Sequence, residues 1–237
     1  TGIRELGKQL AAEKHSAPIH LFITHGHWDH IIGLPFFAPL YSKDTHLVLH
    51  AVTPRARERT LHPIVFDGEH FPVRFSDLPA HIEQDGREGE IQVGSARVTH
   101  VALNHPGGSV GFRIDDADGA SLCYLTDNEL FPPGEVATTA DALARFAAGA
   151  TLLVHDAQYV PADMPAKRGW GHSVVEQVLA LGKDAEARML ALHHHEPERD
   201  DDALDAVAAS AEQWARAEAP AMKTLVARES LSLELKG

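Results

Sequence analysis

Apolar positions along the chain form short runs that fit β-strands, and these runs alternate with segments of helical periodicity. The pattern predicts strands at Ile19 to Thr24, His46 to His50, Ala96 to Ala102, Gly111 to Ile114, Ser121 to Leu125, Leu152 to His155 and Met189 to Leu192. It predicts helices at Ile3 to Lys14, Pro54 to Thr60, Ala140 to Ala147, Ser173 to Gly182 and Asp202 to Ala217. This alternation is typical of a layered α/β protein.

Two intervening segments carry weaker patterns. The segment from His62 to Glu90 is rich in proline, glycine and charge, which indicates a surface excursion with one or two short strands. The acidic stretch from Glu196 to Asp205 is interpreted as a solvated connection with carboxylates at the start of a helix. One helix start is marked more strongly, because Ser173 followed by Glu176 forms a capping-box pattern.

Length and composition predict one domain over residues 1–237, since 237 residues with 44% apolar content can bury a substantial core. The net charge of -13 argues against a long nucleic acid as partner, because phosphate backbones are held by clustered lysine and arginine. Cys123, the single cysteine, excludes an internal disulfide and lies in a strand pattern typical of a core position. A single cysteine also fits a reducing compartment, so the cytoplasm is the expected location. The sequence contains no apolar run of about 18 residues that would indicate a membrane span.

The sequence has 17 histidines, and only their spacing and context can separate ligands from ordinary surface residues. One run stands out, Thr24-His25-Gly26-His27-Trp28-Asp29-His30, directly after a predicted strand. Four potential ligands in six positions leave the strand end through a turn, where their side chains can converge. Imidazoles and carboxylates suit zinc, and a catalytic zinc site keeps one position open for water or substrate. The histidines without such context are expected to be structural: His15, His46, His62, His70, His81 and His100.

This run resembles the hallmark of the metallo-β-lactamase superfamily, His-X-His-X-Asp-His after a strand. The resemblance implies the four-layer αββα fold, with two mixed sheets between layers of helices. It also implies three further ligands, each after a predicted strand: His105, Asp127, and His194 near the C-terminus, with His193 or His195 as alternatives to His194. By this resemblance His25, His27 and His105 hold one metal, Asp29, His30 and His194 hold the second, and Asp127 bridges them.

The resemblance implies a chemistry as well as a ligand set. Two divalent metal ions, most simply zinc with manganese or iron as alternatives, would activate a bridging hydroxide that attacks an ester. Asp29 would also accept a hydrogen bond from that hydroxide. Flavin-linked di-iron relatives have a glutamate at the second hallmark position, whereas this chain has His27, so hydrolysis is favoured over oxygen reduction.

A second pair of motifs resembles the ribonuclease Z and phosphodiesterase branch of the superfamily. Leu152 to Ala157 places Asp156 after a strand, and Gly171-His172-Ser173 places a histidine before a helix. On that similarity His172 contacts the phosphate and protonates the leaving oxygen, while Asp156 orients the imidazole and favours its protonated form. The alternative makes His172 a capping-loop residue and Asp156 a turn former. His155 is either a partner of the site or a core histidine.

The run from Asp29 to Phe37 and the ending His194-His195-Glu196-Pro197 resemble bacterial phosphodiesterases of the cyclic-phosphate type. The opening Thr1 to Gly7 resembles the stretch that follows the first strands in such proteins, so we expect the chain as given to lack those N-terminal strands. Phe36 and Phe37 are expected in the core, with stacking on a base as the alternative.

The substrate expected from these features is a small phosphodiester. Relatives that process transfer RNA carry a long clamping arm, and the 21 residues between His105 and Asp127 leave no room for one there. The runner-up is a lactonase or thioesterase that uses the same metals, and the Asp156 and His172 pair argues against it. A metal-stabilised binding module is the third alternative, although a structural zinc site is normally closed. The resemblance also implies a homodimer.

Overall fold

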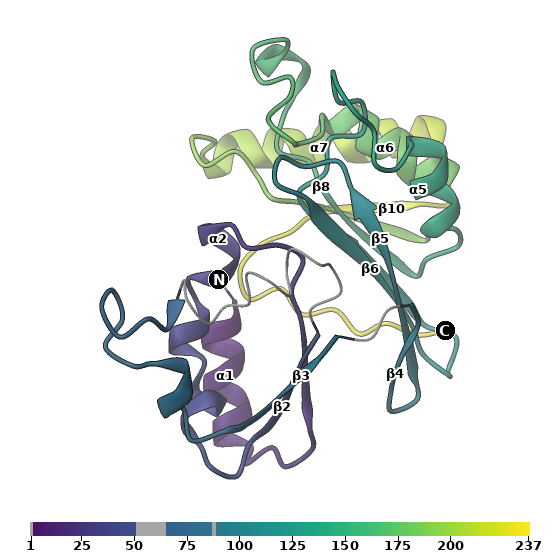
Figure 1. Ribbon diagram of the computed structural model, residues 1–237. Coiled ribbons are helices and arrows are strands. Elements are labelled where there is room, and N and C mark those ends of the chain that lie inside the picture. Colours follow the sequence, from purple (N-terminus) through teal and green to yellow (C-terminus); the bar gives the residue numbers. More distant parts are fainter. Residues whose placement is uncertain (1, 51–64, 87–88) are drawn as a thin grey trace. The chain divides into compact units, whose positions relative to one another are not determined.

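The computed structural model describes residues 2–50, 65–86 and 89–237 of the chain (Figure 1). The chain folds into two compact units, Thr1–Glu88 and Gly89–Gly237. The predicted single domain over residues 1–237 stays a prediction. The helix predicted at Pro54 to Thr60 lies outside the described residues.

The N-terminal unit contains a parallel three-stranded sheet in the order β1-β2-β3. The strands are β1 (Ile19–Phe22), β2 (His46–His50) and β3 (His81–Asp85), and the helices and turns are α1 (Ile3–Ala12), α2 (Trp28–Ile31), η1 (Leu34–Phe36), η2 (Ala38–Tyr41) and η3 (Phe75–Asp77). Strand residues alternate between the two faces of a sheet, so Leu47 and Leu49 lie on one face, where they are buried in a core that α1 covers. Phe37 is part of this core, as predicted, whereas Phe36 is 53% exposed.

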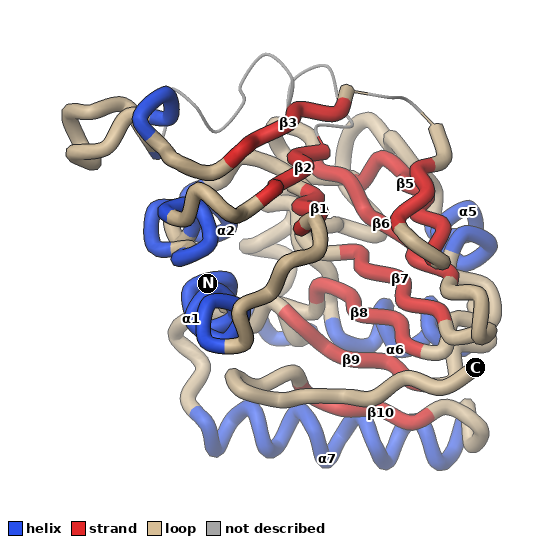
Figure 2. Tube along the Cα trace, turned by 90° about the horizontal axis from the view of Figure 1, so that it is seen from below, coloured by secondary structure: helices blue, strands red, loops and turns tan. Residues whose placement is uncertain are grey.

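The C-terminal unit contains a seven-stranded sheet in the order β10-β9-β8-β7-β6-β5-β4. Figure 2 labels the strands from β10 to β5. These strands are β4 (Ile91–Val93), β5 (Ala96–Leu103), β6 (Ser109–Asp115), β7 (Ser121–Leu125), β8 (Leu152–Asp156), β9 (Met189–His193) and β10 (Lys223–Val226). Pairing is antiparallel from β4 to β7 and parallel from β7 to β10. The carboxyl ends of β7, β8 and β9 therefore meet at one edge of the sheet.

Helices cover one face of the seven-stranded sheet (Figure 1). They are α5 (Ala140–Phe146), α6 (Val175–Asp184) and α7 (Asp201–Glu218), with the short turn η4 (Pro161–Asp163) before α6. Val178 and Leu179 of α6 and Leu190 of β9 are each at most 2% exposed in the shared core. Cys123 of β7 is in this core as well, fully buried, and burial raises the pKa of its thiol to about 12.

The predicted start of α6 is wrong by two residues. The helix begins at Val175, and Val174 rather than Ser173 occupies the cap position. The Ser173 hydroxyl does not cap the helix, because it donates to the Asn128 carbonyl at 2.6 Å and accepts from the Leu130 N–H at 3.1 Å. Ser173 therefore ties the start of α6 to the loop after β7.

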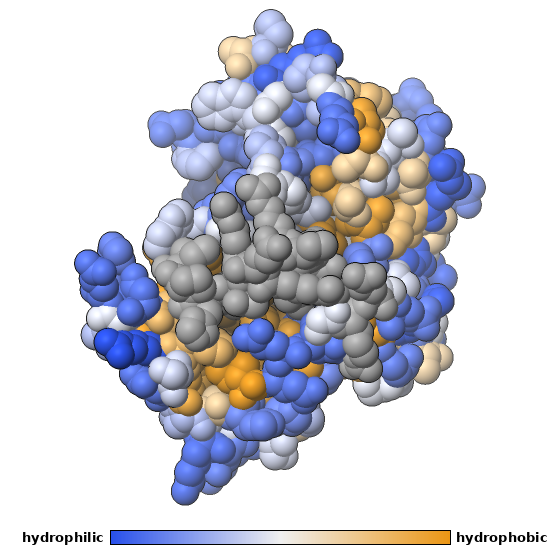
Figure 3. All heavy atoms as spheres, viewed as in Figure 1, coloured by the Kyte–Doolittle hydropathy of each residue, from blue (hydrophilic) through white to orange (hydrophobic). Residues whose placement is uncertain are grey.

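The described surface is mainly hydrophilic, with smaller apolar areas, in the view of Figure 3. This agrees with the net charge of -13. In the described part of the chain, no helix is both long enough and apolar enough to span a bilayer.

Candidate metal centre and proton-donor site

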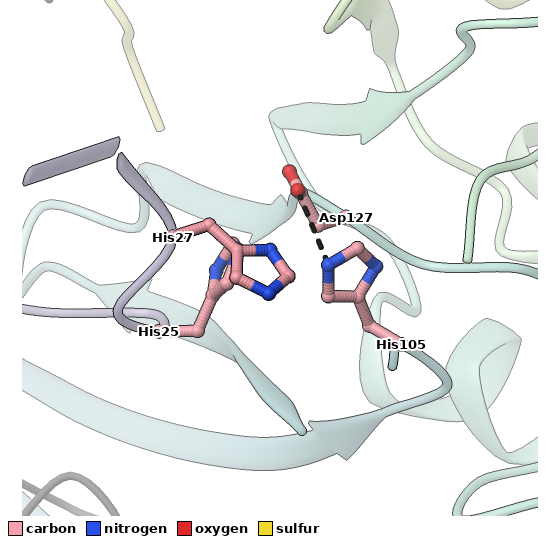
Figure 4. A group of neighbouring side chains, drawn as sticks. All are labelled: His25, His27, His105 and Asp127. Atoms are coloured by element: carbon pink, nitrogen blue, oxygen red, sulfur yellow. Dashed lines mark hydrogen bonds and ion pairs between the residues drawn. The ribbon is translucent and has the colours of Figure 1, made fainter. Parts of the chain in front are cut away.

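The hallmark loop begins where β1 ends, and its first two histidines lie side by side. His25 Nε2 is 3.1 Å from His27 Nδ1, and the two rings meet edge to face (Figure 4). Thr24 Oγ1 lies 3.2 Å from His25 Nδ1, on the opposite side of the ring from His27, and so holds the His25 ring in place. Two ring nitrogens at this distance either share a proton or face a common cation.

Asp29 and His30 form the second pair of the hallmark loop. Both lie in the single turn of α2, which begins directly after His27. His27 has an extended backbone and occupies the N-cap position of this helix. Asp29 Oδ2 lies 3.0 Å from His30 Nε2, and the His30 ring packs against the ring of His25 at a centroid distance of 4.4 Å. The hallmark residues of the N-terminal unit thus form two adjacent pairs of possible metal ligands, His25 with His27 and Asp29 with His30.

In the C-terminal unit, Asp127 lies between His105 and His194. Its Oδ2 is 3.6 Å from His105 Nε2, the pair joined by the dashed line in Figure 4, and its Oδ1 is 3.5 Å from His194 Nε2. Ligand atoms of a tetrahedral zinc, each about 2.0–2.2 Å from the ion, are about 3.4 Å apart. The two carboxylate oxygens thus face different histidines at ligand spacing, which is the arrangement that a bridging carboxylate needs.

The backbone at these two strand ends is strained. Asp127 has φ 55° and His194 has φ 57°, a left-handed conformation that costs a residue other than glycine roughly 1–2 kcal/mol. Such strain is retained where the surrounding structure enforces it, often at functional sites. His194 differs in this respect from both of its neighbours.

The other two C-terminal histidines face elsewhere. His195 Nε2 lies 3.2 Å from the Ala227 carbonyl, and the ring of His193 packs against Tyr124. Burial lowers the pKa of His193 to about 4. Of the three, His194 is the histidine whose ring nitrogen lies near Asp127, which favours it over the two alternatives.

Gly171 sets the orientation of His105. The Nδ1 of His105 lies 3.0 Å from the Gly171 carbonyl and donates to it, which leaves the lone pair on Nε2, the nitrogen that faces Asp127. A Cβ at residue 171 would overlap that Nδ1, and the backbone there has φ 91°. Only glycine fits this contact.

His172 and Asp156, predicted as the proton donor and its partner, are brought together. His172 Nδ1 lies 2.5 Å from Asp156 Oδ2, and Asp156 is fully buried at the end of β8. The His172 ring stacks on His194 at a centroid distance of 4.9 Å and an angle of 11°. One ligand-type atom from each of Asp156, His172 and His194 lies within 4.8 Å of the others.

Backbone donors surround the Asp156 carboxylate. It accepts from the N–H groups of Gln158 at 3.1 Å, Ser173 at 3.3 Å and Asn128 at 3.3 Å. His155 lies fully buried beside it, with Nδ1 2.6 Å from the Asp156 carbonyl and Nε2 3.2 Å from the Asn128 amide. Burial lowers the pKa of His155, so this ring is neutral and supports the site from the core.

Glu129 is a site residue that no sequence pattern indicated. It is 3% exposed, and its two oxygens accept from the N–H groups of Gly169 at 2.9 Å and Gly171 at 3.0 Å. Glu129 therefore fixes the loop that presents both the His105 acceptor and His172. Its acidic side chain two residues after Asp127 was the available signal, but its partners are about 40 residues away in sequence.

Comparisons with known proteins agree with this architecture. A family model described as "Beta-lactamase superfamily domain" matches residues 3–195. A ribonuclease Z from Shouchella clausii (strain KSM-K16) is 27% identical over 223 residues, covering 73% of this chain and 68% of the relative.

Two solved structures have the same fold. The metallo-β-lactamase fold protein YhfI from Bacillus subtilis matches with a TM-score of 0.64 at 16% identity, over 95% of this chain and 81% of that one. A diphosphatase from the PhnP family matches with a TM-score of 0.60 at 20% identity, over 97% and 77%. The predicted metallo-β-lactamase fold is thereby confirmed. The chain belongs to the β-lactamase superfamily domain family, and it is a metal-dependent hydrolase related to ribonuclease Z.

Proposed function

We propose that this chain is a dinuclear metal-dependent phosphodiesterase that cleaves a small phosphodiester of the cyclic-nucleotide or cyclic-phosphate type. The observation that carries the proposal is the His172 and Asp156 pair, stacked on His194 at the strand ends of the C-terminal unit. A histidine held by a buried carboxylate beside a metal ligand is suited to protonating the leaving oxygen of a phosphate ester.

The metal ligands come from both units in this proposal. The N-terminal unit supplies the two donor pairs of the hallmark loop, and the C-terminal unit supplies Asp127 between His105 and His194. His25, His27 and His105 would hold one ion, Asp29, His30 and His194 the other, and Asp127 would bridge them. The match of one family model to residues 3–195, which span both units, supports this combination.

The donor set of nitrogen and oxygen atoms suits two divalent ions, zinc first and manganese or iron as alternatives. When bound, such ions supply an activated water and neutralise charge on the attacked phosphate. Asp29 accepts a hydrogen bond from the attacking water and so orients it. His172, whose Nδ1 faces Asp156, donates the proton of Nε2 to the leaving oxygen.

The segment between His105 and Asp127 supports a small substrate. β6 and β7 occupy most of these 21 residues as a hairpin of the sheet, so no clamping arm is inserted there. The net charge of -13 would also repel a long nucleic acid. We further propose a cytoplasmic location and a homodimer.

The first test compares substrates of different classes on the metal-loaded protein. We expect turnover of bis-p-nitrophenyl phosphate but not of a chromogenic lactone or a thioester. Asp127→Ala should lose bound metal, measured as metal per chain, because both histidine pairings converge on this carboxylate. Preferential turnover of the lactone or thioester would make the chain a lactonase or thioesterase that uses the same metal ligands.

The second test isolates the role of His172. His172→Ala should lower turnover of an alkyl phosphodiester by about 10²- to 10⁴-fold, the usual contribution of general acid catalysis. It should affect a p-nitrophenyl ester much less, because p-nitrophenolate leaves without a proton. The matched control is His70→Ala, since His70 Nδ1 also lies 2.5 Å from an aspartate, Asp67, but its side chain is 78% exposed. Equal losses for both leaving groups would exclude the proton-donor role.

A further inference from the structure

Trp170 is exposed although both of its neighbours are fixed. Its side chain is 58% exposed, among the most exposed large apolar residues that the structure describes. Gly169 and Gly171, on either side, each donate a backbone N–H to the buried Glu129. The indole is therefore held outward by a rigid loop, one residue from Gly171 and two from His172.

Lys167 fixes the indole from one face. Its Nζ lies 4.3 Å from the centroid of the Trp170 ring and 5.7 Å from that of Tyr159. Tyr159 is fully buried, and its ring meets the ring of His172 edge to face at 5.9 Å. This chain of contacts links the orientation of the exposed indole to the proton-donor histidine.

An indole in this position contributes little to folding, because more than half of its surface stays in water. It is suited instead to stacking on a flat ring, a contact that every nucleobase can make. Lys167 and Arg168 add positive charge to the same loop in a chain of net charge -13. An aromatic group that carries a phosphate matches both features, whereas a purely apolar partner matches only the indole.

We propose that Trp170 is a stacking platform for the nucleobase of the substrate, so that the phosphodiester cleaved beside His172 is a nucleoside ester. This inference rests on the proposed phosphodiesterase function and names its substrate class. Lys167 holds the indole in place, and the base stacks on the remaining exposed indole surface.

The kinetic test uses two esters with the same leaving group, thymidine 5′-(p-nitrophenyl phosphate) and methyl p-nitrophenyl phosphate. Only the first carries a base. Trp170→Ala should lower the ratio of kcat/KM for the nucleoside ester to kcat/KM for the methyl ester by about 5- to 20-fold, within the range for loss of one stacked base. Trp170→Phe should retain most of the ratio, because phenylalanine can still stack.

Trp214→Phe is the matched control. Trp214 also has a lysine near its ring, Lys183 at 6.0 Å, but this pair lies on α7 and in the last turn of α6, away from the His172 end of that helix. The ratio should be unchanged in this variant.

A binding measurement separates this inference from the proposed function. Adenosine 5′-monophosphate should quench tryptophan fluorescence of the metal-loaded protein, ribose 5-phosphate should not, and Trp170→Phe should abolish the quenching. If neither ester is hydrolysed but this quenching occurs, the phosphodiesterase proposal fails and the platform stands. If both esters are hydrolysed, while Trp170→Ala leaves the ratio unchanged and the two ligands give equal signals, the platform is overturned.

Discussion

At the scale of single residues, the sequence indicates the proposed metal ligands more directly than the groups that orient them. His25, His27, Asp29 and His30 follow one another in a recognisable run, and His105, Asp127 and His194 each come after a predicted strand. The contacts of Glu129 and of the Gly171 carbonyl have no such local pattern. Glu129 contacts a loop about 40 residues further along the chain, and the Gly171 carbonyl accepts from a histidine 66 residues earlier. Pairings of this kind depend on the folded chain.

Gly171→Ala is expected to disturb the metal site as well as the backbone. The added Cβ would overlap both His105 Nδ1 and Pro106 Cδ, so His105 must rotate. We expect loss of bound metal together with a decrease in the free energy of unfolding of more than the roughly 1–3 kcal/mol that backbone strain alone costs. Metal per chain and urea unfolding would measure both effects.

Gly149→Ala is the control for backbone strain. Gly149 also has positive φ, 63°, but nothing lies within 4 Å of its added Cβ. This variant should be destabilised while its metal content stays that of the wild type. Equal metal loss in both variants would contradict the contact with His105 as the cause.

His155 gives a pH-dependent share of stability. Burial lowers its pKa in the folded state, so the unfolded chain takes up a proton first, at a pKa near the ordinary value of about 6.5. The contribution of neutral His155 to the free energy of unfolding is fully present above that pH. It is lost as the pH falls towards the lower pKa that His155 has in the folded protein. The free energy of unfolding of metal-free protein should therefore fall more steeply from about pH 7 to about pH 5 in the wild type than in His155→Gln. His15→Gln, which changes an exposed histidine, should keep the wild-type slope.

At the scale of elements, strands with continuous apolar runs were predicted well and short edge strands were not. β2 and β7 have the predicted bounds, and β8 and β9 differ by one residue at the end, because apolar residues make up most of each strand. β4 and β10 are edge strands of three and four residues, too short and too exposed to show a pattern. The capping of α6 failed for another reason, since Ser173 makes its hydrogen bonds with the loop after β7.

The start of α7 offers a test at this scale. The Asp200 side chain accepts from the Ala203 N–H at 2.9 Å and so caps the helix. Asp200→Ala should lower the free energy of unfolding by about 1 kcal/mol, the typical value of such a cap. Asp202→Ala, which removes a carboxylate of the first turn but no cap, should cost less. The difference is measurable by urea unfolding, and equal effects would indicate that the helix dipole alone matters.

At the scale of the whole molecule, the sequence predicted the fold family because the hallmark run identifies it. The division into units of residues 1–88 and 89–237 was not part of that prediction, because the hallmark run identifies a family and does not indicate where the chain divides.

Metal removal is expected to lower the thermal stability of the whole chain. A ligand that binds only the folded state at a concentration 100 times its Kd contributes about 2.7 kcal/mol, which corresponds to a Tm increase of roughly 5–10 °C at this chain length. Calorimetry with zinc and with a chelator would measure the difference. Asp127→Ala should show little response to either addition, and a full response in that variant would contradict the bridging role.

The carbonyl of Gly171 has a thermodynamic consequence. It accepts a hydrogen bond from His105, a proposed metal ligand, and the same short loop presents Trp170 and His172. A metal held by His105 and a nucleotide stacked on Trp170 would therefore both favour the loop conformation described here. Coupling of this kind is reciprocal, because two binding equilibria that share one structural element change each other's affinity by the same factor. Metal-loaded protein would then bind nucleotide more tightly than metal-free protein, and nucleotide would slow the loss of metal to a chelator. Metal binding and nucleotide binding would thus be coupled through this loop, so that the protein with metal bound is also the form that binds substrate best.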